Sequence, residues 1–181
     1  MARATLRLPT NAPGPLYVDQ SCIDCGTCWS LAPGVFEEHE SARARVARQP
    51  TTPDERARAF MALVACPTSS IGTEERNAAA ELRVAARAFP DPIADGVLAC
   101  GYASPHSYGA SSWLITREGA RPVLVDSPRA APPLLDRLEA LGGVELMVLT
   151  HKDDVADHRR FRERFGCTRV LHEADVDDDT A

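Results

Sequence analysis

The chain has 181 residues, of which 44% are hydrophobic and 25% are charged, a composition typical of a globular protein with one or two domains. Its 20 Lys and Arg residues are outnumbered by 26 Asp and Glu residues, which gives a formal charge of −6. This balance excludes an overall cationic surface and argues against nucleic acid as the main partner. Residues 1–10 lack the continuous apolar stretch of a signal peptide, and no later run is long enough to cross a bilayer. We therefore expect a cytoplasmic protein with no membrane association.

The first predicted strand covers residues 16–18, which are apolar and follow a segment rich in chain-breaking residues. The N-terminal segment over residues 1–15 is expected to be irregular because prolines and a glycine occupy residues 13–15. One helical turn is predicted after a group of cysteines, and it stops at the Pro-Gly pair of residues 33–34. A charged stretch then continues to Arg48.

A longer helix is predicted after a turn at residues 50–53, with Asp54 as its N-cap. Apolar residues recur in it at intervals of three and four residues and give it one buried face: Ala57, Phe60, Met61, Val64 and Ala65. This helix ends beside Cys66. A second helix is predicted over residues 74–88, which are rich in Ala, Glu and Arg but have little apolar bulk. We interpret residues 74–96 as a linker helix and turn between two domains.

The second region, residues 97–181, has short apolar runs separated by turns or by amphipathic stretches. Its predicted elements in chain order are strand 112–116, strand 123–125, helix 131–141, strand 146–149, a helix that ends at Gly166, and strand 170–171. The helix over residues 131–141 begins with two prolines and is followed by two glycines, which are common at these positions of a helix.

Six cysteines are too few for a disulfide scaffold in a chain of this length, and four of them lie in a pattern that favours metal in a reducing compartment. Cys22, Cys25 and Cys28 follow one another at intervals of three residues, and Cys66 stands before a proline after a long gap. This spacing lets one loop wrap a compact iron-sulfur cluster while the fourth ligand comes from elsewhere. Gly26, which has no side chain, lets the backbone approach such a cluster closely.

This pattern resembles that of the bacterial single-cluster ferredoxins over about residues 16–73. The resemblance comprises the cysteine loop, a proline, an apolar residue followed by Phe, and a distant Cys-Pro: Cys22, Cys25, Cys28, Pro33, Val35, Phe36, Cys66 and Pro67. It implies a ferredoxin-like domain that holds one 4Fe-4S cluster through the four cysteines. Two-cluster relatives carry a further cysteine where residues 29–33 have none, and relatives with a three-iron cluster lack the ligand that Cys25 supplies. One cluster with four irons is therefore expected.

A zinc site is the main alternative, because four cysteines can also bind one tetrahedral zinc ion. Such sites usually present two separated C-x2-C pairs, whereas three of the cysteines overlap here. Four thiols without metal are a further alternative. The remaining two, Cys100 and Cys167, are expected to be packed thiols without a ligand or redox role.

A second group of potential metal ligands follows the predicted strand at residues 146–149. The segment resembles the metallo-β-lactamase fold family, in which a strand end carries T-H-x-H-x-D-H and the chain then enters a helix. The resemblance implies a Zn or Fe site with His151 as the first ligand, Asp153 at the position of the second His, and Asp157 and His158 as the closing pair.

This second motif departs from that family, because Asp153 replaces a histidine and the closing pair is displaced by two residues. It is similar to a divergent branch that reads H-x-D-D-x-x-D-H and carries a ferredoxin ahead of a lactamase-like domain. The 85 residues of the second region are too few for both halves of an αββα sandwich. The structural alternative is that the aspartates stabilise a helix N-terminus and that His158 is a surface residue.

The predicted fold is therefore α+β: a ferredoxin-like iron-sulfur domain over residues 16–73, a linker over residues 74–96, and a partial α/β region over residues 97–181 that corresponds to half of a metallo-β-lactamase-like sandwich. The expected function is electron transfer with a redox partner protein, a reductase or oxidase. The competing prediction is a metal-dependent hydrolase in which the cluster has a structural or redox-sensing role. A third interpretation is that the chain is part of a longer protein.

Overall fold

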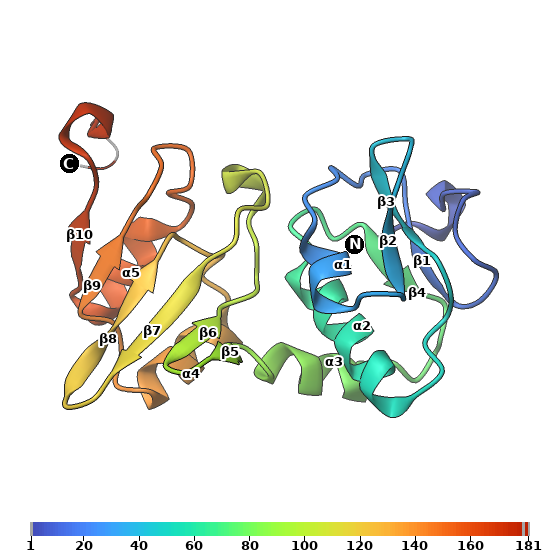
Figure 1. Ribbon diagram of the computed structural model, residues 1–181, viewed down its shortest axis with the longest axis horizontal. Coiled ribbons are helices and arrows are strands. Elements are labelled where there is room, and N and C mark those ends of the chain that lie inside the picture. Colours follow the sequence, from blue (N-terminus) through green and yellow to red (C-terminus); the bar gives the residue numbers. More distant parts are fainter. Residues whose placement is uncertain (1, 179, 181) are drawn as a thin grey trace. The chain divides into compact units, whose positions relative to one another are not determined.

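The computed structural model describes residues 2–178 and residue 180, and the chain divides into two compact units (Figure 1). Unit 1 comprises Met1–Ala86 and unit 2 comprises Arg87–Ala181. Unit 2 begins before the boundary predicted at residue 97, because residues 91–94 of the predicted linker form a strand of its sheet.

Unit 1 contains short strands and helices around one core. In chain order its elements are a 3-10 turn at Ala4–Leu6, β1 (Leu16–Val18), α1 (Thr27–Leu31), β2 (Phe36–His39), β3 (Arg43–Val46), α2 (Pro53–Ala65), β4 (Ile71–Thr73) and α3 (Ala79–Arg87). Strand β1 pairs antiparallel with β4, and β2 pairs antiparallel with β3. The β2–β3 hairpin lies in the stretch that the sequence marked only as charged. It forms because Phe36, Ala44 and Val46 turn into the core while the charged side chains between them face outward.

Helix α2 begins two residues earlier than a helix capped by Asp54 would. Its N-cap is Thr52, whose hydroxyl accepts a hydrogen bond from the N–H of Glu55 at 3.2 Å, while the Glu55 carboxylate reaches back to the cap. This is a capping box, with Pro53 in the first turn. The buried face is also displaced from the predicted one, since Ala57 is exposed. The buried residues of this helix are Ala59, Phe60, Met61, Ala62 and Ala65.

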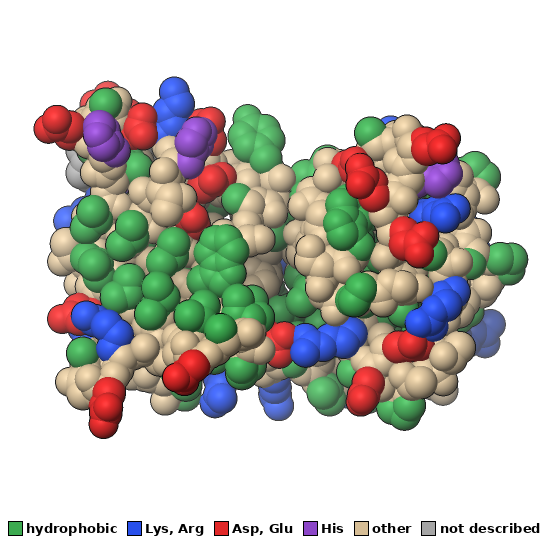
Figure 2. Space-filling model, viewed as in Figure 1, with side chains coloured by type: hydrophobic (Ala, Val, Ile, Leu, Met, Phe, Trp, Pro, Cys, Tyr) green, Lys and Arg blue, Asp and Glu red, His purple; other side chains and the backbone are tan. Residues whose placement is uncertain are grey.

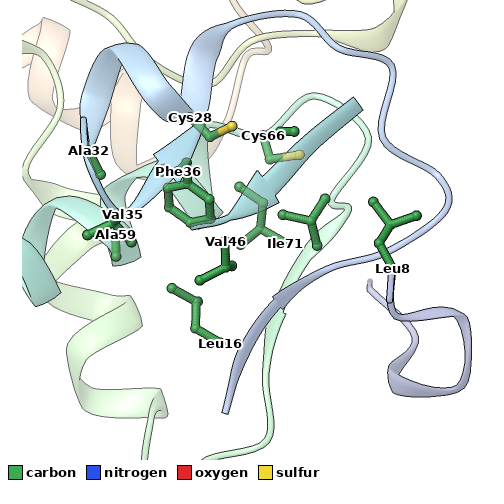
Figure 3. Packing of buried hydrophobic residues seen from close by; sticks show 13 residues of the cluster. Leu8, Leu16, Cys28, Ala32, Val35, Phe36, Val46, Ala59, Cys66 and Ile71 are labelled. Atoms are coloured by element: carbon green, nitrogen blue, oxygen red, sulfur yellow. The ribbon is translucent and has the colours of Figure 1, made fainter. Parts of the chain in front are cut away.

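The core of unit 1 lies between these elements, and two cysteines sit at one edge of it (Figure 3). Val18, Val35 and Phe36 are fully buried at its centre. Cys28 and Cys66 are 7% and 8% exposed and belong to the same cluster. The core therefore holds α1 and the end of α2 together beneath these two sulfurs.

Unit 2 is built on one mixed six-stranded sheet. Its elements are β5 (Asp91–Ala94), β6 (Val97–Ala99), a 3-10 turn at Pro105–Ser107, β7 (Trp113–Arg117), β8 (Ala120–Val125), α4 (Pro132–Ala140), β9 (Leu146–Val148), α5 (His158–Phe165), β10 (Thr168–Val170) and a 3-10 turn at Glu173–Asp175. The strand order is β10-β9-β8-β7-β6-β5, with β8, β9 and β10 parallel and the other neighbours antiparallel. The predicted succession of strand, strand, helix and strand is confirmed for β7, β8, α4 and β9, whereas β5 and β6 were not predicted.

The two faces of this sheet differ in burial. Leu114, Leu124 and Met147, which occupy aligned positions on three neighbouring strands, are 0% exposed. Their strand neighbours Trp113 and Val125 point to the other face and remain half-buried. Figure 1 shows α4 and α5 behind the sheet, and Figure 2 shows apolar side chains gathered on the front of this unit. The sheet thus has one covered face and one open apolar face.

None of the helices in the described part of the chain combines the length and the apolar character that crossing a membrane requires.

Candidate metal centre

The loop after β1 carries three of the four cysteines. It contains two residues with left-handed backbone, Asp24 at φ 60° and Gly26 at φ 82°, which curl the chain back on itself. Gly26 is the N-cap of α1, so Cys28 lies in the first turn of that helix. Within seven residues the loop therefore presents Cys22, Cys25 and Cys28 around one concave surface.

The fourth cysteine lies at the C-terminal end of α2, the longest helix described in unit 1. Cys66 is the C-cap of α2, and its own N–H donates to the carbonyl of Ala62 at 3.0 Å. The following proline ends the helix, because it cannot supply the next N–H. The chain then turns, and the N–H of Ser70 donates to the Cys66 sulfur at 3.3 Å. The sulfur is thereby oriented by the turn that follows it.

All four cysteines predicted as ligands line one pocket. Cys22 and Cys25 are half-buried. Cys28 and Cys66 are buried at the edge of the core (Figure 3). The pocket is lined by Val18, Cys22, Ile23, Cys25, Gly26, Thr27, Cys28, Trp29, Ala44, Cys66, Thr68, Ser70 and Ile71. Its walls are thus sulfur, apolar and hydroxyl groups, supplied by β1, the cysteine loop, β3 and the segment after α2.

Backbone N–H groups already point at two of the sulfurs. The sulfur of Cys22 accepts from the N–H of Ala44 at 3.3 Å and from that of Asp24 at 3.5 Å. The Cys66 sulfur accepts from Ser70, as described above. Hydrogen bonds of this kind stabilise thiolate sulfurs that bind metal. Ala44 belongs to the β2–β3 hairpin, so the sequence pattern gave no indication of its role.

Burial makes two of these thiols, those of Cys22 and Cys28, hard to ionise without a metal. Burial raises the pKa of the Cys28 thiol far above its ordinary value, and the neighbouring thiols Cys22, Cys25 and Cys66 raise it further. Burial also raises the pKa of Cys22, although the N–H groups of Asp24 and Ala44 oppose the shift. Four thiolates this close together need a cation to replace their protons. The pocket therefore fits a positively charged iron-sulfur core better than four free thiols.

A site for one zinc ion is the alternative to a cluster at this pocket. Zn–S bonds of about 2.3 Å place the four sulfurs of a zinc site about 3.8 Å from one another. Over the residues that the structure describes, no group of three or more His, Cys, Asp or Glu side chains is close enough to hold a single ion. The four cysteines line one pocket, and their spacing in the sequence favours an iron-sulfur cluster over two separated pairs that hold one zinc ion.

The second predicted site is not assembled. His151 and Asp153 are exposed on a turn, with 3.6 Å between the Nδ1 of the histidine and a carboxylate oxygen of the aspartate. Asp157, which precedes α5, accepts a hydrogen bond from the N–H of Ala130 at 2.8 Å. The imidazole of His158 is 3% exposed rather than on the surface, and its Nδ1 lies 2.8 Å from the guanidinium of Arg169.

Two of these four side chains have other partners in the structure. A guanidinium beside His158 repels a second cation, and the Asp157 carboxylate is already used to hold a neighbouring loop. Of the aspartates in the structural alternative, Asp157 occupies the N-cap position of α5, at the positive end of the helix, but makes no side-chain cap hydrogen bond. Another aspartate, Asp126 at the end of β8, connects two strand ends by accepting from the N–H and hydroxyl of Thr150 at 2.7 and 3.0 Å.

The two remaining cysteines are buried, as predicted. Cys100 is 0% exposed and Cys167 is 3% exposed. Burial raises the pKa of Cys100 to about 12. Both thiols belong to unit 2, and neither lines the pocket of unit 1.

A comparison with known protein families points to the same segment as the pocket does. Residues 18–73 match the family model of the 4Fe-4S single cluster domain of Ferredoxin I. This segment is similar to single-cluster ferredoxin domains. It contains all four pocket cysteines, and its boundaries lie close to the predicted range of 16–73. The resemblance of unit 2 to the metallo-β-lactamase family has no support from a family match.

No curated protein and no solved structure matches the chain.

Proposed function

We propose that the ferredoxin domain binds one 4Fe-4S cluster through Cys22, Cys25, Cys28 and Cys66 and exchanges single electrons with a partner protein. The observation that carries this proposal is the pocket lined by these four cysteines, which come from a loop and from a distant helix end within a segment that matches a single-cluster ferredoxin domain. A bound cluster supplies reversible one-electron chemistry.

The residues of the chain would tune and shield this chemistry. The N–H groups of Ala44 and Ser70 stabilise negative charge on the sulfurs of Cys22 and Cys66. The apolar core beneath Cys28 keeps water from one side of the site. Ile23 lines the pocket and is 45% exposed, so a partner could contact apolar surface directly beside the cysteines.

Anaerobic purification followed by metal analysis tests the proposal. We expect about four irons and four sulfides per chain, a brown colour that bleaches with dithionite, and an electron paramagnetic resonance signal in the reduced state. Voltammetry should give one reversible one-electron wave. A colourless protein that holds one zinc per chain and no sulfide would refute the iron-sulfur assignment.

A further inference from the structure

The ferredoxin domain contains the pattern Cys-x-Thr twice, and the two threonines have different surroundings. The Thr27 hydroxyl lies 3.4 Å from the sulfur of Cys25. The Thr68 hydroxyl lies 3.8 Å from the sulfur of Cys66, but only 2.5 Å from the hydroxyl of Ser70. The two positions therefore form a matched pair in which only the second threonine has a closer hydrogen-bond partner than the sulfur.

The contact between Thr68 and Ser70 belongs to a chain of hydroxyl groups. The Ser70 hydroxyl lies 2.9 Å from that of Ser21, and the Ser21 hydroxyl donates to the carboxylate of Asp19 at 2.5 Å. Asp19 is 1% exposed and Ser70 is 0% exposed, whereas Ser21 lies at the surface. A continuous path of hydrogen-bonding groups thus leads from the buried carboxylate to the sulfur of Cys66.

Counting protons gives this path a direction. It contains four contacts, but its three hydroxyls carry one proton each, and both ends are acceptors. One contact must therefore lack a proton. The bond from Ser21 to the Asp19 carboxylate is short and charge-assisted, and the contact between Thr68 and Cys66 is the longest of the four. The missing proton belongs at that last contact.

We propose that Asp19 is a positioning residue that draws the hydroxyl protons of Ser21, Ser70 and Thr68 toward itself and so withholds the Thr68 proton from the Cys66 sulfur. The inference rests on the proposed function, because Cys66 must be a cluster ligand for the effect to be measurable. The Thr27 hydroxyl, in contrast, donates to the Cys25 sulfur. The two threonines then contribute unequally to the reduction potential.

The expected effect follows from the charge that reduction adds. A hydrogen bond to a ligand sulfur stabilises the more negative, reduced state and raises the midpoint potential. Thr27→Val should therefore lower the potential, whereas Thr68→Val should leave it unchanged in the wild-type background. Ser70→Ala removes the competing acceptor without altering any charge and keeps the backbone N–H that points at Cys66. It should free the Thr68 proton and raise the potential.

The test is a double-mutant cycle on the purified, cluster-loaded protein, with the midpoint potential as the readout. We expect Thr68→Val to lower the potential in the Ser70→Ala background but not in the wild-type background. An Asp19→Asn background provides a second cycle that decides the matter if Ser70→Ala does not fold. The Fe–S stretching frequencies in resonance Raman spectra should shift together with the potential.

Two outcomes would overturn the inference, and they can be told apart. If Thr68→Val has the same effect in every background while the cluster is intact, Asp19 acts only through its charge and the directed path is refuted. If the wild-type protein holds no iron and sulfide, the proposed function fails as well.

Discussion

The two units of this chain each carry a dense group of potential metal ligands, but only unit 1 brings its group together. Its four cysteines come from two elements and line one pocket. In unit 2, His158 and Asp157 instead contact Arg169 and the backbone of Ala130, while His151 stays on an exposed turn. Density of ligand residues along the sequence is therefore a weaker indicator of a site than convergence from two elements.

The units also differ in how they bury apolar surface. The core of unit 1 lies between its strands and helices and includes two of the pocket cysteines. In unit 2 one face of the sheet is buried and the other face is open, so that burial alternates along β7 and β8. In unit 1 the packing directly supports the site, whereas in unit 2 it supports the sheet alone.

The largest expected effect is on iron content, and it distinguishes a pocket cysteine of unit 1 from a buried cysteine of unit 2. Cys66→Ser should abolish most cluster binding, because it removes one of four thiolate ligands from a buried position. Cys100→Ser, the matched change in unit 2, should leave the iron content unchanged, although it also alters a buried thiol. Iron and sulfide analysis checks both variants. Equal loss of iron in the two would contradict the separation between the units.

The next effect tests the two faces of the sheet in unit 2. Leu124→Ala should lower the free energy of unfolding by about 2–5 kcal/mol, because it leaves a cavity beneath the covered face. Val125→Ala, on the next residue of the same strand, should cost about 1 kcal/mol or less, because its side chain is half-exposed. Thermal and denaturant unfolding measure both. A larger loss for Val125→Ala would mean that something covers the open face.

A smaller effect compares two glycines with left-handed backbone, one in each unit. Gly26 has φ 82° and Gly119, in the hairpin between β7 and β8, has φ 70°. An added Cβ would make only ordinary contact with Trp29 at Gly26 and no contact at Gly119. Each alanine variant should therefore lose only the free energy of the backbone strain, about 1–2 kcal/mol of stability. Gly26→Ala should also slow or reduce cluster assembly, whereas Gly119→Ala should not. Reconstitution kinetics followed by absorbance distinguish them.

The smallest effect concerns charge in unit 2. Burial raises the pKa of Asp154, and the neighbouring Asp126 raises it further, while His151 opposes the shift. A carboxyl whose pKa is raised on folding destabilises the folded state when it is ionised, and this cost disappears as the pH falls below its ordinary value of 3.8. Asp154→Asn should therefore stabilise the protein by a few tenths of a kcal/mol at pH 7. The gain should vanish near pH 3, and a gain that persists there would point to a cause other than charge.

Much of the architecture could be read from local patterns. The strand at residues 16–18, the helix that leads to Cys66 and the succession from β7 to β9 all follow from apolar periodicity and chain-breaking residues. The β2–β3 hairpin could not be read this way, because its alternating charged side chains resemble a solvated loop until the buried Val46 is seen in the core. The position of the α2 cap also depends on backbone geometry that only the folded chain reveals.

The sequence by itself determined which residues could bind a cluster, since the spacing of Cys22, Cys25 and Cys28 and the distant Cys66 is a local chemical pattern that needs no fold to be recognised. Only the tertiary structure decided which candidate residues meet. Packing brings the end of α2 beside the cysteine loop and the Asp19 carboxylate into reach of the hydroxyl path. It also gives His158 a guanidinium neighbour that no spacing rule could reveal, because hydrogen-bond partners distant in sequence are chosen by the packed fold.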